Sequence, residues 1–165
     1  MVYRLCISLF TIFFFSLSTL FSSAQNWTHF RGSEMNGHAN VETAPLNWSD
    51  STNIEWKVPV NGEGWSSPVV YGDQIWLTSA TDDGTKFFAL CFDFETGELL
   101  SEKTIFTCAE PQRIHSTNSY ATPTPCIEEG FVYVHYGTFG TACIDTETFE
   151  VAWKREDLKA EHMQG

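Results

Sequence analysis

Residues 143–153 read CIDTETFEVAW, and residues 91–101 read CFDFETGELLS. The two stretches carry a Cys, an Asp, a Thr and a Glu in the same slots, with apolar residues on either side of them. Each predicts a strand, a tight turn and a returning strand. A repeat built from short strands favours a propeller or a β-solenoid, in which each unit buries one face against its neighbour.

The residues before each copy supply the remaining strands of two units. In the first unit we expect strands at 67–71, 75–80, 87–92 and 98–103, and in the second at 123–127, 131–136, 141–144 and 150–155. Tight hairpins between them predict antiparallel four-stranded sheets, which is the composition of a propeller blade. The expected fold class is therefore all-β, a partial β-propeller of about two blades plus one further strand.

That further strand is expected just before the first unit. Residues 53–60 alternate apolar and polar side chains, which is typical of a half-buried strand. Trp56-Lys57 matches Trp153-Lys154 at the end of the second unit. We therefore interpret residues 54–60 as the last strand of another unit and as the candidate latch of a closed ring.

The amino terminus predicts an address outside the cytoplasm. Arg4 is followed by an apolar and hydroxyl run over residues 5–21 and by small residues up to Ala24, so residues 1–24 are expected to be a cleaved signal peptide. An uncleaved membrane anchor is the alternative. Cys6 lies too early for a lipoprotein, so we expect a secreted or periplasmic protein with no stable membrane span after cleavage.

The rest of the chain divides into two parts. Residues 25–52 are expected to form an amino-terminal arm with Trp27 and Phe30 packed on the body, and residues 53–165 hold the repeats. Without Arg4 the chain keeps 8 basic and 21 acidic side chains, a net charge of −13. Such an acidic chain repels phosphate backbones, which excludes nucleic acid as a partner.

Four cysteines follow the signal. Cys91 and Cys143 occupy equivalent repeat positions in apolar strands and are interpreted as inert core thiols. Cys108 and Cys126 flank the connection between the units, where a disulfide would suit an oxidising compartment. The sequence has no CxxC pair and no His/Cys cluster at zinc spacing, so it predicts no metal site.

The repeated stretch resembles the tryptophan-docking motif of PQQ-type β-propeller repeats, Ala-x-Asp-x-x-Thr-Gly-Lys-x-x-Trp. The residues that carry this resemblance are Asp93, Thr96 and Gly97 in the first copy, and Asp145, Thr148 and Trp153 in the second. The departures are Cys91 and Cys143 for Ala, Phe149 for Gly, Glu98 and Glu150 for Lys, and Ser101 for Trp. Ser101 puts the docking contact of the first unit in doubt, and Phe149 is expected to change the geometry of the second turn.

The resemblance implies a ring of about seven or eight blades, whereas two blades and one strand do not close one. We therefore expect an amino-terminal fragment of a longer protein; assembly with other chains is the alternative. The partners would be the remaining blades, in the rest of the chain or in another chain. The family includes quinoprotein dehydrogenases, so PQQ with calcium is implied as a cofactor by resemblance alone.

The best polar cluster for a ligand is His115 with Asn118, Ser119 and Tyr120, in the connection between the units. Arg31 is a further candidate, although such an Arg more often ties an arm to the protein body. The residues show no nucleophile with a base and no phosphate loop, so no catalytic residue is assigned.

Three functions stay open from sequence. The favoured one is a non-catalytic propeller scaffold that binds a protein or a small molecule. The alternatives are the amino-terminal part of a quinone-dependent dehydrogenase and a propeller like the outer-membrane protein assembly factors. A shared fold does not choose among them.

Overall fold

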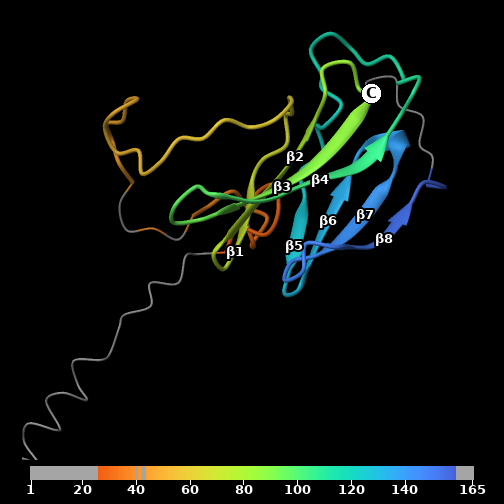
Figure 1. Ribbon diagram of the computed structural model, residues 1–165. Helices are drawn as coiled ribbons and strands as arrows, with labels where there is room; N and C mark the ends of the chain where they lie inside the picture. The colour runs from red at the N-terminus through yellow and green to blue at the C-terminus, as the bar shows by residue number, and fades with distance from the viewer. Residues whose placement is uncertain (1–25, 40, 42–43, 159–165) are drawn as a thin grey trace, which may run out of the picture.

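The computed structural model describes residues 26–39, 41 and 44–158, and the predicted signal peptide lies outside them. The described chain is all-β and forms two four-stranded antiparallel sheets (Figure 1). No helix among the described residues is long and apolar enough to cross a membrane.

Each sheet follows the chain from strand to strand, and the order is β1-β2-β3-β4 in the first and β5-β6-β7-β8 in the second. The strands are β1 (Val69–Tyr71), β2 (Gln74–Ala80), β3 (Lys86–Asp93), β4 (Leu99–Thr107), β5 (Cys126–Glu128), β6 (Phe131–His135), β7 (Thr141–Asp145) and β8 (Val151–Arg155). A 3₁₀ turn, η1 (Gly137–Phe139), joins β6 to β7. All eight expected strands of the two units are thus confirmed, with ends shifted by a few residues.

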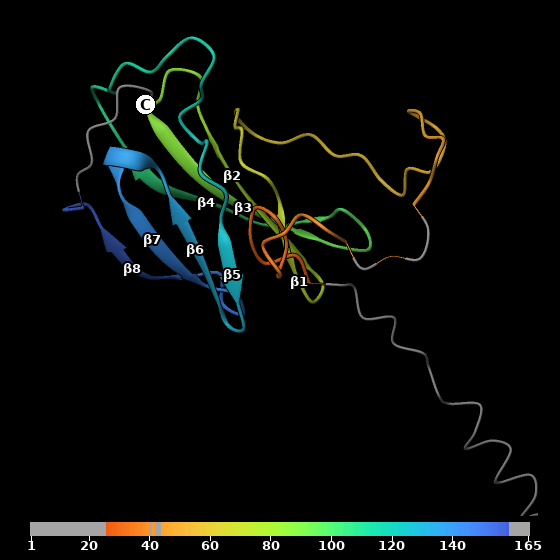
Figure 2. The same ribbon diagram turned by 180° about the vertical axis from the view of Figure 1, so that it is seen from behind.

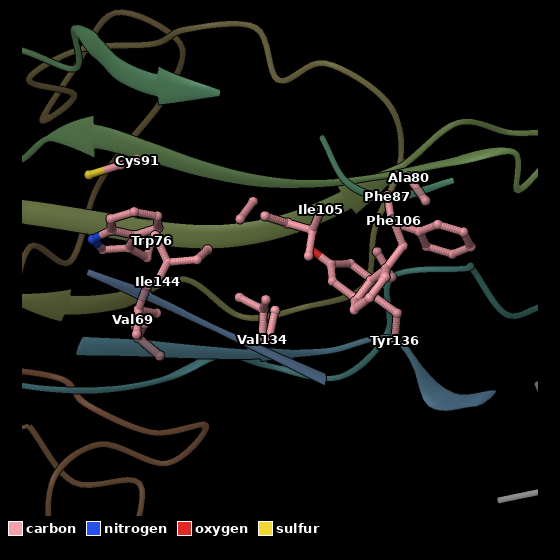
Figure 3. Close-up of a cluster of buried hydrophobic side chains, with 14 of the residues drawn as sticks. Val69, Trp76, Ala80, Phe87, Cys91, Ile105, Phe106, Val134, Tyr136 and Ile144 are labelled. Carbon is pink, nitrogen blue, oxygen red and sulfur yellow. The ribbon is translucent and has the colours of Figure 1, made fainter. Parts of the chain in front are cut away.

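The two sheets share one hydrophobic core. In Figure 3, Val69, Trp76 and Ile105 of the first sheet lie with Val134 and Ile144 of the second in a single cluster of buried side chains. The Tyr136 hydroxyl donates to the Phe88 carbonyl at 2.7 Å, so a hydrogen bond also joins the sheets. The units therefore stabilise each other by burying apolar surface, as the repeat predicts.

The turn between β3 and β4 is closed by Asp93. Its Oδ1 accepts from the Thr96 backbone N–H and hydroxyl, both at 2.7 Å, while the Thr96 hydroxyl accepts from the Glu98 N–H. Asp145 holds the β7–β8 turn in the same way, with Thr148 N and Oγ1 at 2.7 and 2.9 Å from its Oδ1. These side chains satisfy turn N–H groups that the ladder leaves unpaired.

Phe149 corrects an expectation about the second turn. Its φ is +59°, close to the +71° of the equivalent Gly97, so the two turns share one backbone conformation. The Phe149 ring lies 6.0 Å from the Trp76 ring and packs against the shared core. Burial of the ring offsets the cost of the left-handed conformation, which is about 1–2 kcal/mol for a residue with a Cβ.

Residues 54–60 are not a strand, contrary to the expectation. The chain there forms no ladder; instead the Trp56 ring covers Gly97, and its Nε1 donates to the Phe94 carbonyl at 3.0 Å. Val58 packs on the cluster of Phe88, Leu90 and Phe92. The alternating pattern thus reflects side chains that attach an extended segment to the first sheet.

The first sheet has Ser101 where the second has Trp153, and other residues supply the contact to the second turn. Gln74 Nε2 donates to the carbonyl of Thr146, which is the equivalent of Phe94, and Gln74 Oε1 accepts from Trp76 Nε1. Trp153 is 43% exposed and contacts Tyr133.

The arm is attached through its first described residues. Trp27 exchanges two backbone hydrogen bonds with Val70 of β1, and Thr28 accepts one from Ile127 of β5. Phe30 is 63% exposed, so its expected packing on the body is wrong. Residues 44–52, orange in both views, project away from the sheets (Figures 1 and 2).

The four described cysteines are all free thiols. Cys91 and Cys143 are buried in β3 and β7, and burial raises the pKa of Cys91 to about 12. Cys108 follows β4 in the first sheet and Cys126 begins β5 in the second. The disulfide expected between Cys108 and Cys126 is therefore not formed in this structure.

Gly97→Ala is expected to destabilise the fold more than Gly72→Ala. Both glycines have positive φ, but a Cβ at Gly97 would lie 2.6 Å from the Trp56 ring, whereas nothing lies within 4 Å at Gly72. We expect a loss of about 1–2 kcal/mol for Gly72→Ala and about 2 kcal/mol more for Gly97→Ala. Urea unfolding measures both, and equal losses would show that Trp56 does not pack on this turn.

Acidification is expected to destabilise the turns. Hydrogen bonds from the Thr96 hydroxyl and N–H lower the pKa of Asp93, and those from the Thr148 N–H and hydroxyl lower the pKa of Asp145. Because the folded-state pKa lies below the unfolded one, this stabilisation is present above about pH 4 and is lost as the pH falls through the folded-state values.

The melting temperature of Asp145→Asn should therefore depend less on pH below about 4 than that of the parent protein. Asp50→Asn, at an exposed position outside both turns, is the control and should keep the parent's profile. An Asp145→Asn profile parallel to the parent's would contradict this assignment.

Candidate functional site

The connections that precede β1 and β5 meet at one end of the sheets. The backbone N–H groups of Trp65 and Ser66 both donate to the Ala121 carbonyl, at 3.0 and 3.2 Å. Ser67 N–H donates to the Thr124 hydroxyl at 3.0 Å. Two connections at equivalent places in the repeat are thus tied directly to each other.

A cavity of about 570 Å³ lies between these connections and β2. Trp65 and Glu63 line it from the first connection, Asp82 from the β2–β3 hairpin, and Asn118 and Ser119 from the second connection. Its volume is within the range typical of small-molecule sites. It is therefore the candidate ligand site.

The first connection is held tightly against β2. Glu63 and Ala80 exchange two backbone hydrogen bonds of 2.8 and 2.9 Å. A Cβ would lie 2.4 Å from the Ala80 oxygen at Gly62 and 2.7 Å from the Thr78 oxygen at Gly64. This approach requires two glycines, and they flank Glu63 at the wall of the cavity.

Internal hydrogen bonds fix the polar floor of the cavity. The Ser79 hydroxyl donates to the Asn61 carbonyl at 2.5 Å, Thr78 Oγ1 donates to the Pro123 carbonyl at 3.2 Å, and Ser66 Oγ donates to the Thr78 carbonyl at 3.0 Å. No buried side-chain nitrogen or oxygen among the described residues lacks a partner. The walls are thus preformed.

The two neighbouring acids of the β2–β3 hairpin, Asp82 and Asp83, have different surroundings. Asp83 Oδ1 accepts from the Thr81 and Thr85 hydroxyls at 2.6 and 2.7 Å, and these bonds lower the pKa of Asp83. Asp82 lines the cavity instead and forms no ion pair with any described residue. Of the two acids, Asp82 is the one placed to meet a ligand.

Of the ligand-binding residues predicted from the sequence, some line the cavity and others lie elsewhere. Asn118 lines the cavity, whereas Tyr120 packs on Gly84 and Phe87 and borders a second, smaller cavity. The His115 ring bonds to the Thr117 hydroxyl at 2.9 Å within its own loop. Arg31 lies in the arm and lines neither cavity.

Trp65, Glu63 and Asp82 were not candidates from sequence. One signal could have indicated Trp65, because it stands two residues before Ser67-Pro68 as Tyr120 stands before Thr122-Pro123. The carboxylates carry no such signal, since turns and loops ordinarily contain acids.

The lining does not fit the quinone that the family resemblance implies. Pyrroloquinoline quinone carries carboxylate groups, and the described residues around this cavity offer carboxylates and no Lys, Arg or His. No group of three or more His, Cys, Asp or Glu within the described ranges is arranged to hold a metal ion.

No protein-family model matches the chain, and no curated protein is significantly similar to it.

The two acids of the hairpin should respond differently to removal. Asp83→Ala is expected to lower the melting temperature by a few degrees, because three hydrogen bonds to Thr81 and Thr85 are lost. Asp82→Ala, its neighbour, should leave the melting temperature unchanged within error. Differential scanning calorimetry compares them, and the opposite order would reverse the roles assigned here.

Proposed function

We propose that this chain forms part of a secreted or periplasmic PQQ-like β-propeller that binds a ligand without transforming it. The observation that carries the proposal is the meeting of two equivalent connections at one preformed cavity. Propellers gather such connections at one end of the ring, where each blade contributes a few side chains. Substitutions in such connections can change which ligand is bound without changing the sheets.

The blade interpretation is supported by the contacts at the last turn of each sheet, between β3 and β4 and between β7 and β8. Trp56 covers Gly97 and donates to Phe94, while Gln74 donates to the equivalent carbonyl of Thr146. The first contact comes from a residue that precedes the first sheet, and the second comes from β2 of the first sheet. Trp153 in β8 would make the same contact with a further blade, which is the partner we propose for it.

A binding role is favoured over dehydrogenase chemistry by the lining of the cavity. An acidic wall repels an anionic quinone, and none of the described lining residues supplies the compensating positive charge. Hydroxyls, an amide and an exposed indole instead provide contacts for recognition.

A thermal-shift panel tests the proposal. We would add neutral oligosaccharides, spermidine, short peptides, and pyrroloquinoline quinone with calcium to the purified protein. At least one of the first three classes is expected to raise the melting temperature and to be recovered unchanged. A ligand at 100 times its Kd stabilises the fold by about 2.7 kcal/mol.

Quinone binding in one-to-one ratio, together with alcohol-dependent reduction of an electron-accepting dye, would overturn the binding role in favour of the dehydrogenase. Absence of a shift with every class would also overturn it.

A further inference from the structure

The hydroxyl groups on the β2 side of the cavity donate within the protein. Ser66, Thr78 and Ser79 each give the hydroxyl hydrogen to a backbone carbonyl. The backbone N–H groups of Glu63 and Trp65 also donate to backbone carbonyls, at 2.8 and 3.0 Å. A hydroxyl that donates in this way still has a lone pair for a ligand. This side of the cavity therefore offers acceptors and not donors.

The second connection is bonded largely within itself. The Asn118 Oδ1 accepts from the Thr122 hydroxyl, and the Ser119 hydroxyl lies 3.3 Å from the same Thr122 oxygen. The Ser119 hydroxyl also accepts from the Ala121 N–H at 3.3 Å. Asn118 and Ser119 therefore hold the connection in place, and the groups that select a ligand lie on the other side of the cavity.

Two carboxylates on that side have no partner. Glu63 is bridged to Ala80, the last residue of β2, and Asp82 follows two residues later, so both acids stand at the same end of this strand. Neither carboxylate accepts a hydrogen bond or forms an ion pair within the described part of the chain.

No positive charge balances these acids at the cavity. None of its described lining residues is Lys, Arg or His, and the whole chain carries a net charge of −12. The electrostatic potential there is therefore negative, which repels phosphates, sulfates and carboxylates and attracts cations.

Trp65 adds a second group that favours a cation. Its side chain is 65% exposed, while its backbone N–H is anchored to the Ala121 carbonyl. The face of an indole attracts cations more strongly than the rings of Tyr or Phe. Only Gly64 separates Trp65 from Glu63, so the ring and a carboxylate line the cavity from one short segment.

The size of the cavity favours an organic cation over a metal ion. Its volume is about 570 Å³, and no group of three or more His, Cys, Asp or Glu among the described residues is arranged to hold a metal. Because the open groups are acceptors, the matching cation carries N–H donors, as primary and secondary ammonium groups do.

We infer that the cavity beside Trp65 binds a linear polyamine, with ammonium groups at Glu63 and Asp82 and the chain across the indole. The inference deepens the proposed binding function and rests on it. A neutral ligand would gain little from the field of the two carboxylates, and an anion would be repelled by it. A polyamine satisfies both acids and the ring at once.

Isothermal titration with spermidine at physiological salt tests this site. The parent protein is expected to bind one spermidine, less tightly as the salt concentration rises. Asp82→Asn and Glu63→Gln should each weaken binding about tenfold, and Trp65→Ala about fivefold. Circular dichroism checks that the variants are folded. Spermidine binding that none of the three substitutions weakens would overturn the assignment.

Two control variants separate this site from attraction to the acidic chain as a whole. Glu129→Gln removes one negative charge at an exposed position of the β5–β6 turn, outside the cavity. Trp48→Ala removes an indole that is 75% exposed and also outside the cavity. Both should bind spermidine like the parent. A loss in Glu129→Gln equal to that in Asp82→Asn would overturn the site in favour of non-specific attraction.

Two control ligands test the chemistry. Butane-1,4-diol has the same carbon chain as putrescine with hydroxyls in place of its amines, so putrescine should bind and the diol should not. Equal binding of the two would contradict a cation site. Magnesium carries two charges but no chain, and it should displace spermidine only in large excess. Displacement by an equal concentration of magnesium would overturn the polyamine assignment.

Failure of this inference can be distinguished from failure of the function on which it rests. If spermidine does not bind while the thermal-shift panel detects a sugar or a peptide, the polyamine site is wrong and the scaffold stands. If no ligand class is bound at all, both are wrong.

Discussion

The last turn of each sheet is closed by an aspartate. Its carboxylate oxygen accepts hydrogen bonds from the residue three positions later in the chain. Asp93 with Thr96, and Asp145 with Thr148, form this arrangement with nearly equal distances. Because the turn is fixed by its own side chains, its outer carbonyl is presented in a constant position. The indole of Trp56 and the amide of Gln74 bind that carbonyl in the two sheets, so contacts beyond each sheet depend on the turn.

Aromatic rings cover several of the positive-φ glycines of this chain. Trp56 covers Gly97 and Tyr120 covers Gly84, each at a distance that leaves no room for a Cβ. Phe149 takes the position of Gly97 in the second turn, and its ring packs against the Trp76 ring of the first sheet. The first sheet has Ser101 at the position of Trp153, and the second turn is contacted instead by Trp76 through the Phe149 ring and by Gln74 through the Thr146 carbonyl.

Local patterns in the sequence were enough to predict the sheets but not the site. Alternation and turn residues indicated all eight strands, because hairpin contacts are close in sequence. The same alternation gave a wrong strand at residues 54–60, since it records which side chains are buried and not what the backbone pairs with. The cavity could not be predicted, because it joins Trp65 to Asn118 through tertiary contacts that leave no periodic trace.

Strands and connections have different roles in the repeat, which explains why a binding site can lie at the connections before β1 and β5. The side chains of the strands and of the last turn in each sheet form hydrogen bonds or pack in the core, so a substitution there disturbs the sheet. The connections before β1 and β5 are tied at a few backbone groups, such as the Ala121 carbonyl, and leave side chains like Trp65 exposed. Side chains in the connections can thus set ligand chemistry while the backbone bonds beneath them keep the geometry, which is how a repeated structural unit carries a specific site.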